Sequence, residues 1–561
     1  FRARPFDLVS TPSACEHCAS GCDMRTDVRR GKTLRRLAGD DSTVNEEWNC
    51  DKGRWAFKYV TSVDRLTTPL VRNSAGELVA ASWPEALAAA AKGLKASKAA
   101  VLVGGRATYE DAYGYSKFAR IALGTNDIDF RSRLASNEER EFLAARVVGS
   151  TTTYVDIDRA DHVLLVGFEP EEESPIVFLR INKQVRKRAL KVTAIATKLS
   201  IGVEKLKGEF VKVAPGAEAS AIASQSLTAK SVILVGERAA ESGGVLSAVA
   251  ALADSTKAKI AWIPRRAGER GALEAGAIGN LLPGGRPVTD ASARVDIAAV
   301  WGVDSLPSAE GKSAQEIYAA VNAGEIGALL VGGVDPLDGD NSQGALAALE
   351  KAFVVSLEIA SSAVTQRADV VLPVAAITEK SGSFLNWEGR PRAFDTAVQD
   401  SLNRSDLRIL SMIAEEMGAT VNLATVTSAV KEIASLGKWD GARVSMSKVS
   451  ASAQPAVSGD QFILTSWRRL LDLGTLQQGE ENLAGTARAT VAVISPKRAG
   501  ALGVVDGDKL KISTSLGSVT LNALVEDIHD DALWAPRNSR GSQLLVNLGV
   551  AHGAVVSVVK V

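Results

Sequence analysis

Short apolar runs that end in glycine recur through the middle of the chain and alternate with stretches of helical periodicity. Four such runs occupy residues 99–105, 163–167, 232–236 and 329–333. Further apolar runs lie at residues 192–196, 259–263, 354–357 and 370–372. Strands that alternate with helices predict doubly wound parallel sheets. Because there are too many strands for one compact domain, we expect an α/β protein with two such domains.

Two of the helices next to these strands have recognisable starts. Ser82 precedes an alanine-rich stretch that has Pro84 in its first turn, where proline is tolerated. Thr108 and Asp111 have the spacing of a capping box and predict a helix that reaches Leu123.

The two ends of the chain have a different pattern. Residues 24–29 and 33–38 alternate polar and apolar positions on either side of a glycine turn, which predicts a β-hairpin with a basic, solvent-exposed face. Residues 445–459 are rich in serine and alanine, as a linker is. Short β runs then predict a compact, mostly β barrel; they lie at residues 490–494, 509–513, 518–525 and 555–561.

These patterns divide the chain into five parts. We expect an N-terminal subdomain, a first α/β domain made of two separate stretches, a second α/β domain, a linker and a C-terminal β-barrel. The expected bounds are residues 1–60, 61–150 with 320–430, 151–319, 431–459 and 460–561.

Composition narrows the class of protein. The 561 residues are 46% hydrophobic and 23% charged, which is typical of a folded globular protein. The 65 basic residues equal the 65 acidic ones, so no charge excess indicates binding to nucleic acid or to an anionic membrane. No run approaches the ~18 apolar residues of a transmembrane helix. Because the chain begins at Phe1 without a signal peptide, we expect it to be a piece of a longer protein or a processed product.

All four cysteines fall within the first 50 residues, as Cys15, Cys18, Cys22 and Cys50. Nothing in the sequence indicates secretion, so metal binding is favoured over disulfides. A structural zinc site normally takes two ligand pairs from separate knuckles. Here three thiolates come from one short loop and the fourth returns 28 residues later, in the spacing C-x2-C-x3-C-x27-C. This arrangement favours a 4Fe-4S cluster, with zinc as the alternative.

Charged residues lie close to the cysteines. A cation two residues after a cluster ligand can tune the cluster's potential or contact a neighbouring cofactor, so Lys52 and Arg54 are candidate cofactor-binding residues. The alternative for Lys52 is a surface lysine. We expect His17, inside the cysteine loop, to be a neighbour of the cluster or a surface residue rather than a ligand.

The cysteine spacing followed by Asp51-Lys52-Gly53-Arg54 resembles the iron–sulfur domain of the molybdopterin oxidoreductases. This family includes formate dehydrogenases and nitrate reductases, and the large iron–sulfur subunit of respiratory complex I is related to it. Residues 378–390, 465–488, 502–508 and 534–541 are also similar to segments of the family. The resemblance implies a C-terminal double-psi β-barrel of the kind that binds molybdopterin dinucleotide.

The family's molybdenum ligand falls, by this resemblance, on Ala135, with Ser136 as a possible substitute. A methyl group cannot bind a metal, so we expect no molybdenum and no catalytic residues. The resemblance then favours the complex I branch, NADH:quinone oxidoreductase, over the alternative of an active molybdopterin-dependent enzyme such as a formate dehydrogenase. We expect the chain to be mainly a scaffold with one cluster on a side branch of the electron path, and to have no independent activity.

Membership of that branch implies partners and a location. The partners would be the NADH/FMN-binding and quinone-proximal subunits of the peripheral arm, and further iron–sulfur clusters would lie in an upstream segment. The location would be the cytoplasmic face of a bacterial plasma membrane, without insertion into it. Consistent with this expectation, the chain has no G-x-G-x-x-G or P-loop fingerprint, and its four histidines form no metal-binding pair.

Overall fold

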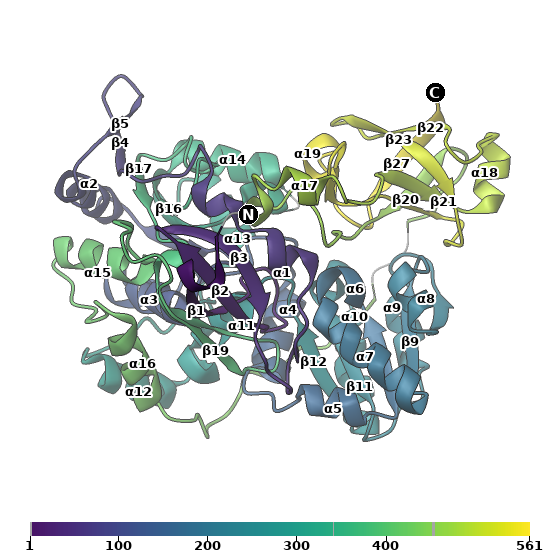
Figure 1. Cartoon of the computed structure of the whole chain (residues 1–561), viewed down its shortest axis with the longest axis horizontal. Coiled ribbons are helices and arrows are strands. Elements are labelled where there is room, and N and C mark those ends of the chain that lie inside the picture. Colours follow the sequence, from purple (N-terminus) through teal and green to yellow (C-terminus); the bar gives the residue numbers. More distant parts are fainter. Residues whose placement is uncertain (1–2, 340, 452–454) are drawn as a thin grey trace.

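The computed structural model describes residues 3–339, 341–451 and 455–561. Four structural parts surround the centre of the molecule, with the N-terminal part in front, the two α/β parts to either side and the C-terminal barrel at the upper right (Figure 1). The part of the 445–459 linker that comprises residues 452–454 lies outside the described residues. No helix in the described ranges has both the length and the apolar content needed to cross a bilayer.

The N-terminal part is a three-stranded antiparallel sheet followed by a short helix. The predicted hairpin is present as β2 and β3, and the helix begins directly after Cys50. A first strand also pairs with β2. The sequence did not indicate this strand, because Pro12 and two serines interrupt its apolar pattern. The elements are β1 (Val9–Ala14), β2 (Asp23–Arg29), β3 (Lys32–Ala38) and α1 (Asp51–Trp55).

The first α/β part is built on a seven-stranded sheet. The five strands from β17 to β7 are parallel, as predicted. In contrast, β4 and β5 form an antiparallel edge, because the short turn that joins them permits only antiparallel pairing. The order of strands across the sheet is β5 (Leu78–Ala80), β4 (Leu70–Arg72), β17 (Val370–Pro373), β16 (Phe353–Glu358), β15 (Ala328–Gly332), β6 (Ala99–Val103) and β7 (Ile128–Asp129).

The second α/β part is a five-stranded sheet in which every pair of strands is parallel. Its order is β10 (Glu209–Lys212), β9 (Lys191–Ala196), β8 (His162–Val166), β11 (Val232–Gly236) and β12 (Lys259–Ile263). The strands of this sheet lie between the two stretches of sequence that build the first sheet. The prediction of two α/β sheets is therefore confirmed, whereas the exact domain bounds stay a prediction.

The C-terminal part is a closed barrel of six strands, which confirms the predicted β-barrel. Two of its neighbouring pairs are parallel and the others antiparallel. Alternate residues of its strands, such as Phe462 and Leu464, fill the interior. The order is β20 (Gln461–Thr465), β24 (Ala532–Trp534), β21 (Val491–Ile494), β23 (Ser518–Val525), β22 (Lys509–Ser513) and β27 (Val555–Lys560).

Two helices of the first part begin where the sequence predicted. Helix α2 (Trp83–Lys95) has a complete capping box formed by Ser82 and Glu85. Helix α3 (Tyr109–Ile121) is capped by Thr108 and is buried along nearly its whole length. Its Asp111 accepts a hydrogen bond from Lys380 Nζ at 2.5 Å. This ion pair ties α3 to the strand β18 (Gly382–Leu385), which carries the family-like 378–390 segment toward the cysteine loop.

Candidate functional site

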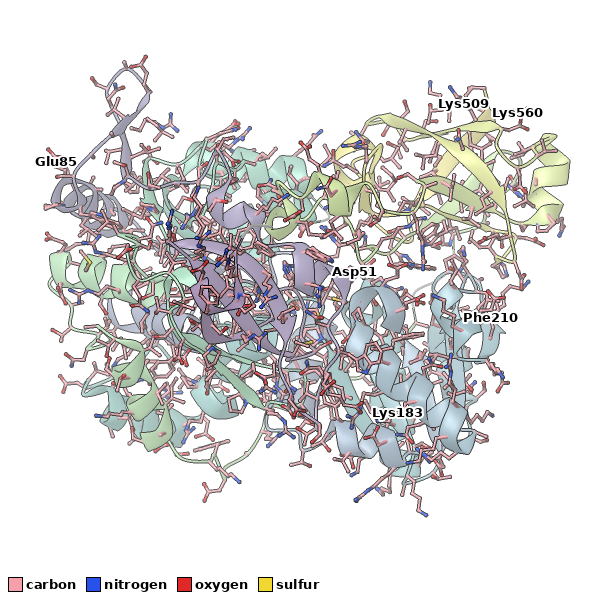
Figure 2. All side chains as sticks on the ribbon, viewed as in Figure 1. Asp51, Glu85, Lys183, Phe210, Lys509 and Lys560 are labelled. Carbon is pink, nitrogen blue, oxygen red and sulfur yellow. The ribbon has the colours of Figure 1, made fainter. Side chains whose placement is uncertain are left out.

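The fold brings the four cysteines together. Cys15, Cys18 and Cys22 lie in the loop between β1 and β2 and are buried, whereas Cys50 caps the N-terminus of α1 and is half-buried. Figure 2 places Asp51, the first residue of α1, on the side of the N-terminal part that faces the second α/β part. None of the four cysteines forms a disulfide.

Gly53 shows how closely the sulfurs approach. A Cβ atom added to Gly53 would lie 3.2 Å from Cys15 Sγ and 3.8 Å from Cys50 Sγ, so these two sulfurs are at most 7.0 Å apart, the sum of the two distances. Any side chain at position 53 would therefore enter the space between them. The backbone N–H of Gly53 also donates to Cys50 Sγ at 3.4 Å.

The electrostatics of the sulfurs fit a cationic cluster. Burial, and then the negative groups of Glu16 and Cys18, raise the pKa of Cys15 well above its usual range, and burial with the other three cysteines does the same for Cys22. Several buried thiolates therefore repel one another unless positive charge lies between them. In the described residues, no three His, Cys, Asp or Glu side chains surround one point closely enough to hold a single metal ion. A polynuclear cluster distributes its ligands over several irons and has a different geometric requirement.

A buried ion pair holds the cysteine loop from inside. Arg36 Nη1 donates to both carboxylate oxygens of Glu16, at 2.8 and 2.6 Å, and the Tyr59 hydroxyl donates to the same carboxylate at 3.0 Å. Burial opposes ionisation of Glu16, but the Arg36 guanidinium outweighs it and lowers the pKa of Glu16. The prediction of a solvated basic hairpin is therefore wrong for Arg36, which is 1% exposed, because the carboxylate inside the loop requires a partner.

His17 is buried beside the cysteines rather than at the surface. Its Nε2 lies 2.9 Å from the carbonyl oxygen of Ala56. Burial lowers the pKa of His17 to about 4, so the ring is neutral at pH 7. Of the other histidines, His162 is also buried and its Nε2 lies 2.8 Å from Thr193 Oγ1, which is a packing role.

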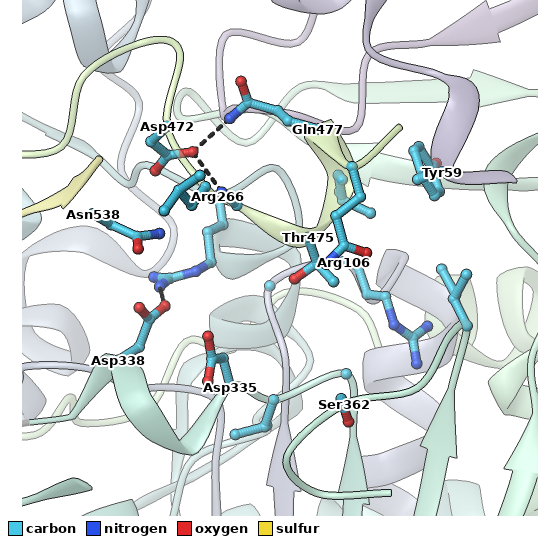
Figure 3. Close-up of a pocket in the computed structure, with 18 of the residues that line it drawn as sticks. Tyr59, Arg106, Arg266, Asp335, Asp338, Ser362, Asp472, Thr475, Gln477 and Asn538 are labelled. Carbon is cyan, nitrogen blue, oxygen red and sulfur yellow. Dashed lines mark hydrogen bonds and ion pairs between the residues drawn. The ribbon is translucent and has the colours of Figure 1, made fainter. Parts of the chain in front are cut away.

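A cavity of about 310 Å³ opens beside the cysteine loop, where all four parts of the molecule meet (Figure 3). Lys52 is 6% exposed and lines this cavity, so it is not a surface lysine. Arg54 does not line it; its guanidinium lies over the Trp55 ring, 5.3 Å from the centroid. The charged residues of the wall are Glu16, Lys52, Arg106, Arg265, Arg266, Asp335, Asp338, Glu358, Arg468 and Asp472.

Most cations of the cavity wall are already paired with carboxylates. Arg266 Nη2 lies 2.6 Å from Asp338, and Arg468 contacts both Asp338 and Asp472. Burial opposes ionisation of Asp472, but Arg468 and then Lys52 lower its pKa. The sequence alone did not indicate these arginines, because Asp338, the partner that they share, is 72 residues from Arg266 and 130 residues from Arg468.

The positions that the family resemblance assigns to a metal ligand lie outside this cavity. Ala135 is half-buried and is not part of the wall. The Ser136 hydroxyl accepts the backbone N–H of Glu139 at 3.1 Å and so caps the helix α4 (Asn137–Phe142). Ser136 thus has a structural use as a helix cap.

Two α/β sheets, a C-terminal barrel and a cysteine-bearing N-terminal part are the architecture of the iron–sulfur oxidoreductases that the chain matches. The molybdopterin oxidoreductase family matches residues 65–416, its Fe4S4 domain matches residues 8–62, and the molybdopterin dinucleotide binding domain matches residues 462–558. The Fe4S4 match includes all four cysteines and supports a 4Fe-4S cluster. Acetylene hydratase from Pelobacter acetylenicus has a similar fold, with a TM-score of 0.67 at 13% identity, covering 98% of this chain and 100% of that one.

Relatives identify the branch. The chain is 52% identical to the G subunit of NADH-quinone oxidoreductase from Mycobacterium tuberculosis, over 100% of this chain and 72% of the relative. It is 49% identical to the corresponding G subunit from Streptomyces coelicolor, over 100% of this chain and 71% of the relative. The chain is 25% identical to the F420-dependent formate dehydrogenase subunit alpha of Methanocaldococcus jannaschii, over 95% of this chain and 94% of the relative. The chain belongs to the family of NADH-quinone oxidoreductase G subunits, and the comparison favours this assignment over a formate dehydrogenase.

Proposed function

We propose that the chain is the large iron–sulfur subunit of the peripheral arm of a proton-translocating NADH:quinone oxidoreductase, and that Cys15, Cys18, Cys22 and Cys50 hold its 4Fe-4S cluster. The observation that carries the proposal is the convergence of four buried or half-buried free thiols from two separate segments. When bound, the cluster would accept and release one electron at a time. The residues of the chain hold it, neutralise its surroundings and keep water from it.

The surrounding residues have defined parts in this function. Glu16 and Arg36 fix the shape of the loop that supplies three ligands. The neutral His17 and the small Gly53 leave room and add no charge next to the sulfurs. Lys52 places a buried cation near the fourth ligand, where it would favour the more negative, reduced state of the cluster.

Molybdenum does not form part of the proposed function, because the residues at its expected site do not fit it. Position 135 offers only a methyl group, and the Ser136 hydroxyl is used as a helix cap. The arginines of the cavity wall that could bind a pyrophosphate are paired with Asp338 and Asp472. The chain then serves mainly as a scaffold, with its cluster on a side branch of the electron path.

The partners and location follow from the same proposal. The NADH/FMN-binding subunit and the quinone-proximal subunits would supply the two ends of the electron path, and an upstream segment would hold further iron–sulfur clusters. The assembly would lie at the cytoplasmic face of a bacterial plasma membrane. The isolated chain is expected to show no NADH dehydrogenase activity, since it has no dinucleotide fingerprint.

Elemental analysis of the anaerobically purified chain tests the proposal. About four irons and four sulfides per chain, without molybdenum, are expected for one cubane. The Cys18→Ser variant should contain clearly less iron than the parent, with a nearby serine changed as the control, Ser13→Ala. Molybdenum with pterin would instead indicate an active molybdopterin oxidoreductase, and zinc alone would indicate a structural zinc protein. Unchanged iron in Cys18→Ser would refute the ligand assignment.

A further inference from the structure

A chain of two serine hydroxyls leads from the second α/β part to a cysteine sulfur. Ser20 Oγ lies 3.4 Å from Cys18 Sγ and 2.7 Å from Ser174 Oγ. Both serines are completely buried, and they are 154 residues apart in sequence. The contact is therefore a tertiary one, made where the cysteine loop meets the start of helix α7 (Pro175–Arg188).

The position of Ser174 is unusual for a serine at a helix N-terminus. A serine there normally accepts a backbone N–H of the first helical turn through its hydroxyl oxygen. The Ser174 hydroxyl makes no such capping bond and lies against Ser20 instead. The N-terminal end of α7, which carries the positive end of the helix dipole, consequently lies next to the cysteine loop.

The Ser20 backbone is held in place by a second contact from the same part of the molecule. The Tyr154 hydroxyl donates to the Ser20 carbonyl oxygen at 2.9 Å, and Tyr154 is completely buried. Ser20 is thus fixed at its main chain and at its side chain. Because Ser20, Ser174 and Tyr154 are all shielded from water, their hydroxyls cannot exchange a protein partner for solvent.

Ligation of a metal fixes the direction of the hydrogen bonds. When Cys18 is a free thiol, its S–H can donate a hydrogen bond to Ser20 Oγ. A cysteine that binds iron is a thiolate without a proton, so the contact persists only if the Ser20 hydroxyl donates to Cys18 Sγ. The Ser20 oxygen then accepts a hydrogen bond from the Ser174 hydroxyl, and both hydroxyls donate in the direction of the sulfur.

We propose that Ser174 and Ser20 form a hydrogen-bond chain that raises the reduction potential of the cluster by donating to Cys18 Sγ. The inference rests on the proposed function, since it requires a cluster bound to Cys18. Reduction adds one electron to the cluster and moves no proton. Donors aimed at a ligand sulfur stabilise the added negative charge, so they favour the reduced state. Ser20 and Ser174 are positioning and tuning residues and do not bind the metal.

The test is a redox titration of the anaerobically purified 561-residue chain, followed by the electron paramagnetic resonance signal of the reduced cluster. In Ser20→Ala, the ratio of reduced to oxidised cluster at a fixed potential should fall about tenfold, which equals a midpoint about 59 mV lower for one electron. Ser174→Ala should give a smaller fall, about threefold, because it removes only the outer donor. Ser174→Thr keeps the hydroxyl and should restore the parental midpoint.

Ser13→Ala is the matched control. Ser13 is a buried serine two residues before Cys15, and within the described ranges it makes no hydrogen bond to a cysteine sulfur. The midpoint potential of the cluster in Ser13→Ala should equal that of the parent. If Ser20→Ala binds no iron, Ser174→Ala, which lies outside the loop, decides the question. Parental midpoints in iron-replete alanine variants would overturn the inference alone, whereas a parent chain without iron would overturn the proposed function as well.

Discussion

The buried ion pair between Arg36 and Glu16 offers the sharpest test of how the cysteine loop is held. We consider Arg36→Met, which keeps most of the apolar stem but removes the guanidinium. The change deletes two hydrogen bonds to Glu16 and one from Arg36 Nη2 to the Ala14 carbonyl oxygen, at 2.5 Å. Glu16 is 4% exposed, and among the described residues the Tyr59 hydroxyl is then the one side chain that still donates a hydrogen bond to its carboxylate.

The size of the effect follows from the burial of both partners. Removing one member of a buried ion pair costs about 3–5 kcal/mol, because it leaves an uncompensated charge. At about 1.4 kcal/mol per factor of ten, local opening of residues 8–62 should become at least a hundredfold more frequent. Replacing both partners, in Arg36→Met with Glu16→Gln, removes the charge as well as its partner and should cost clearly less than the single change.

Hydrogen exchange of the purified chain, read by mass spectrometry on peptides from residues 8–62, measures this effect directly. The barrel strands β22 and β23 lie in a separate core and serve as the internal reference, where exchange should not change. Two results would contradict the reasoning. One is a loss below about 1 kcal/mol in Arg36→Met, as for an exposed ion pair. The other is a double variant as unstable as the single one.

Three further predictions concern other parts of the chain. Burial lowers the pKa of His552 from 6.5 to about 4, with Glu241 opposing the shift and Arg537 adding to it. Below pH 6.5 the unfolded chain therefore binds a proton at His552 that the folded chain does not. The free energy of unfolding should fall by up to about 3 kcal/mol as the pH falls from 6.5 to 4. In denaturation experiments over the same pH range, His552→Gln should lose less stability than the parent. Ala135→Cys should not produce formate or nitrate turnover, and molybdenum near one atom per parent chain would refute this expectation. Cys50→Ala should reduce the yield of assembled NADH:quinone oxidoreductase far more than its turnover per flavin; a rate near zero in fully assembled enzyme would place the cluster on the main electron path.

The central strands of both sheets could be predicted from the sequence because they are buried on both faces. Such strands are nearly continuous apolar runs, and β6, β8, β11 and β15 are buried at every position. Two strands in other environments gave no such signal. The edge strand β1 contains a proline and two serines, and β24 has only three residues, so neither forms a recognisable period.

The candidate site divides in the same way between local and long-range information. The cysteines could be found because a metal-binding loop needs its ligands at short spacings, and three of the four lie within eight residues. The residues that surround the loop could not be found from the sequence. Glu16 and Arg36 are 20 residues apart, Ser20 and Ser174 are 154 apart, and Arg106 and Asp406 are 300 apart. No pattern of polarity along the chain contains such pairings, since only the assembled fold brings the partners together.

Other long-range ion pairs join the four parts around the cavity and bear on the proposed role as a scaffold. Arg468 of the barrel contacts Asp338 of the first α/β part, and Arg537 of the barrel donates to Glu241 of the second at 2.7 and 2.6 Å. Arg133 lies 3.3 Å from Glu237 and so joins the two α/β parts. Buried ion pairs add little net stability over apolar packing, but a misplaced part would leave each charge buried without its partner. We therefore infer that these pairs act chiefly on the relative positions of the four parts, which is the property that the proposed scaffold role requires.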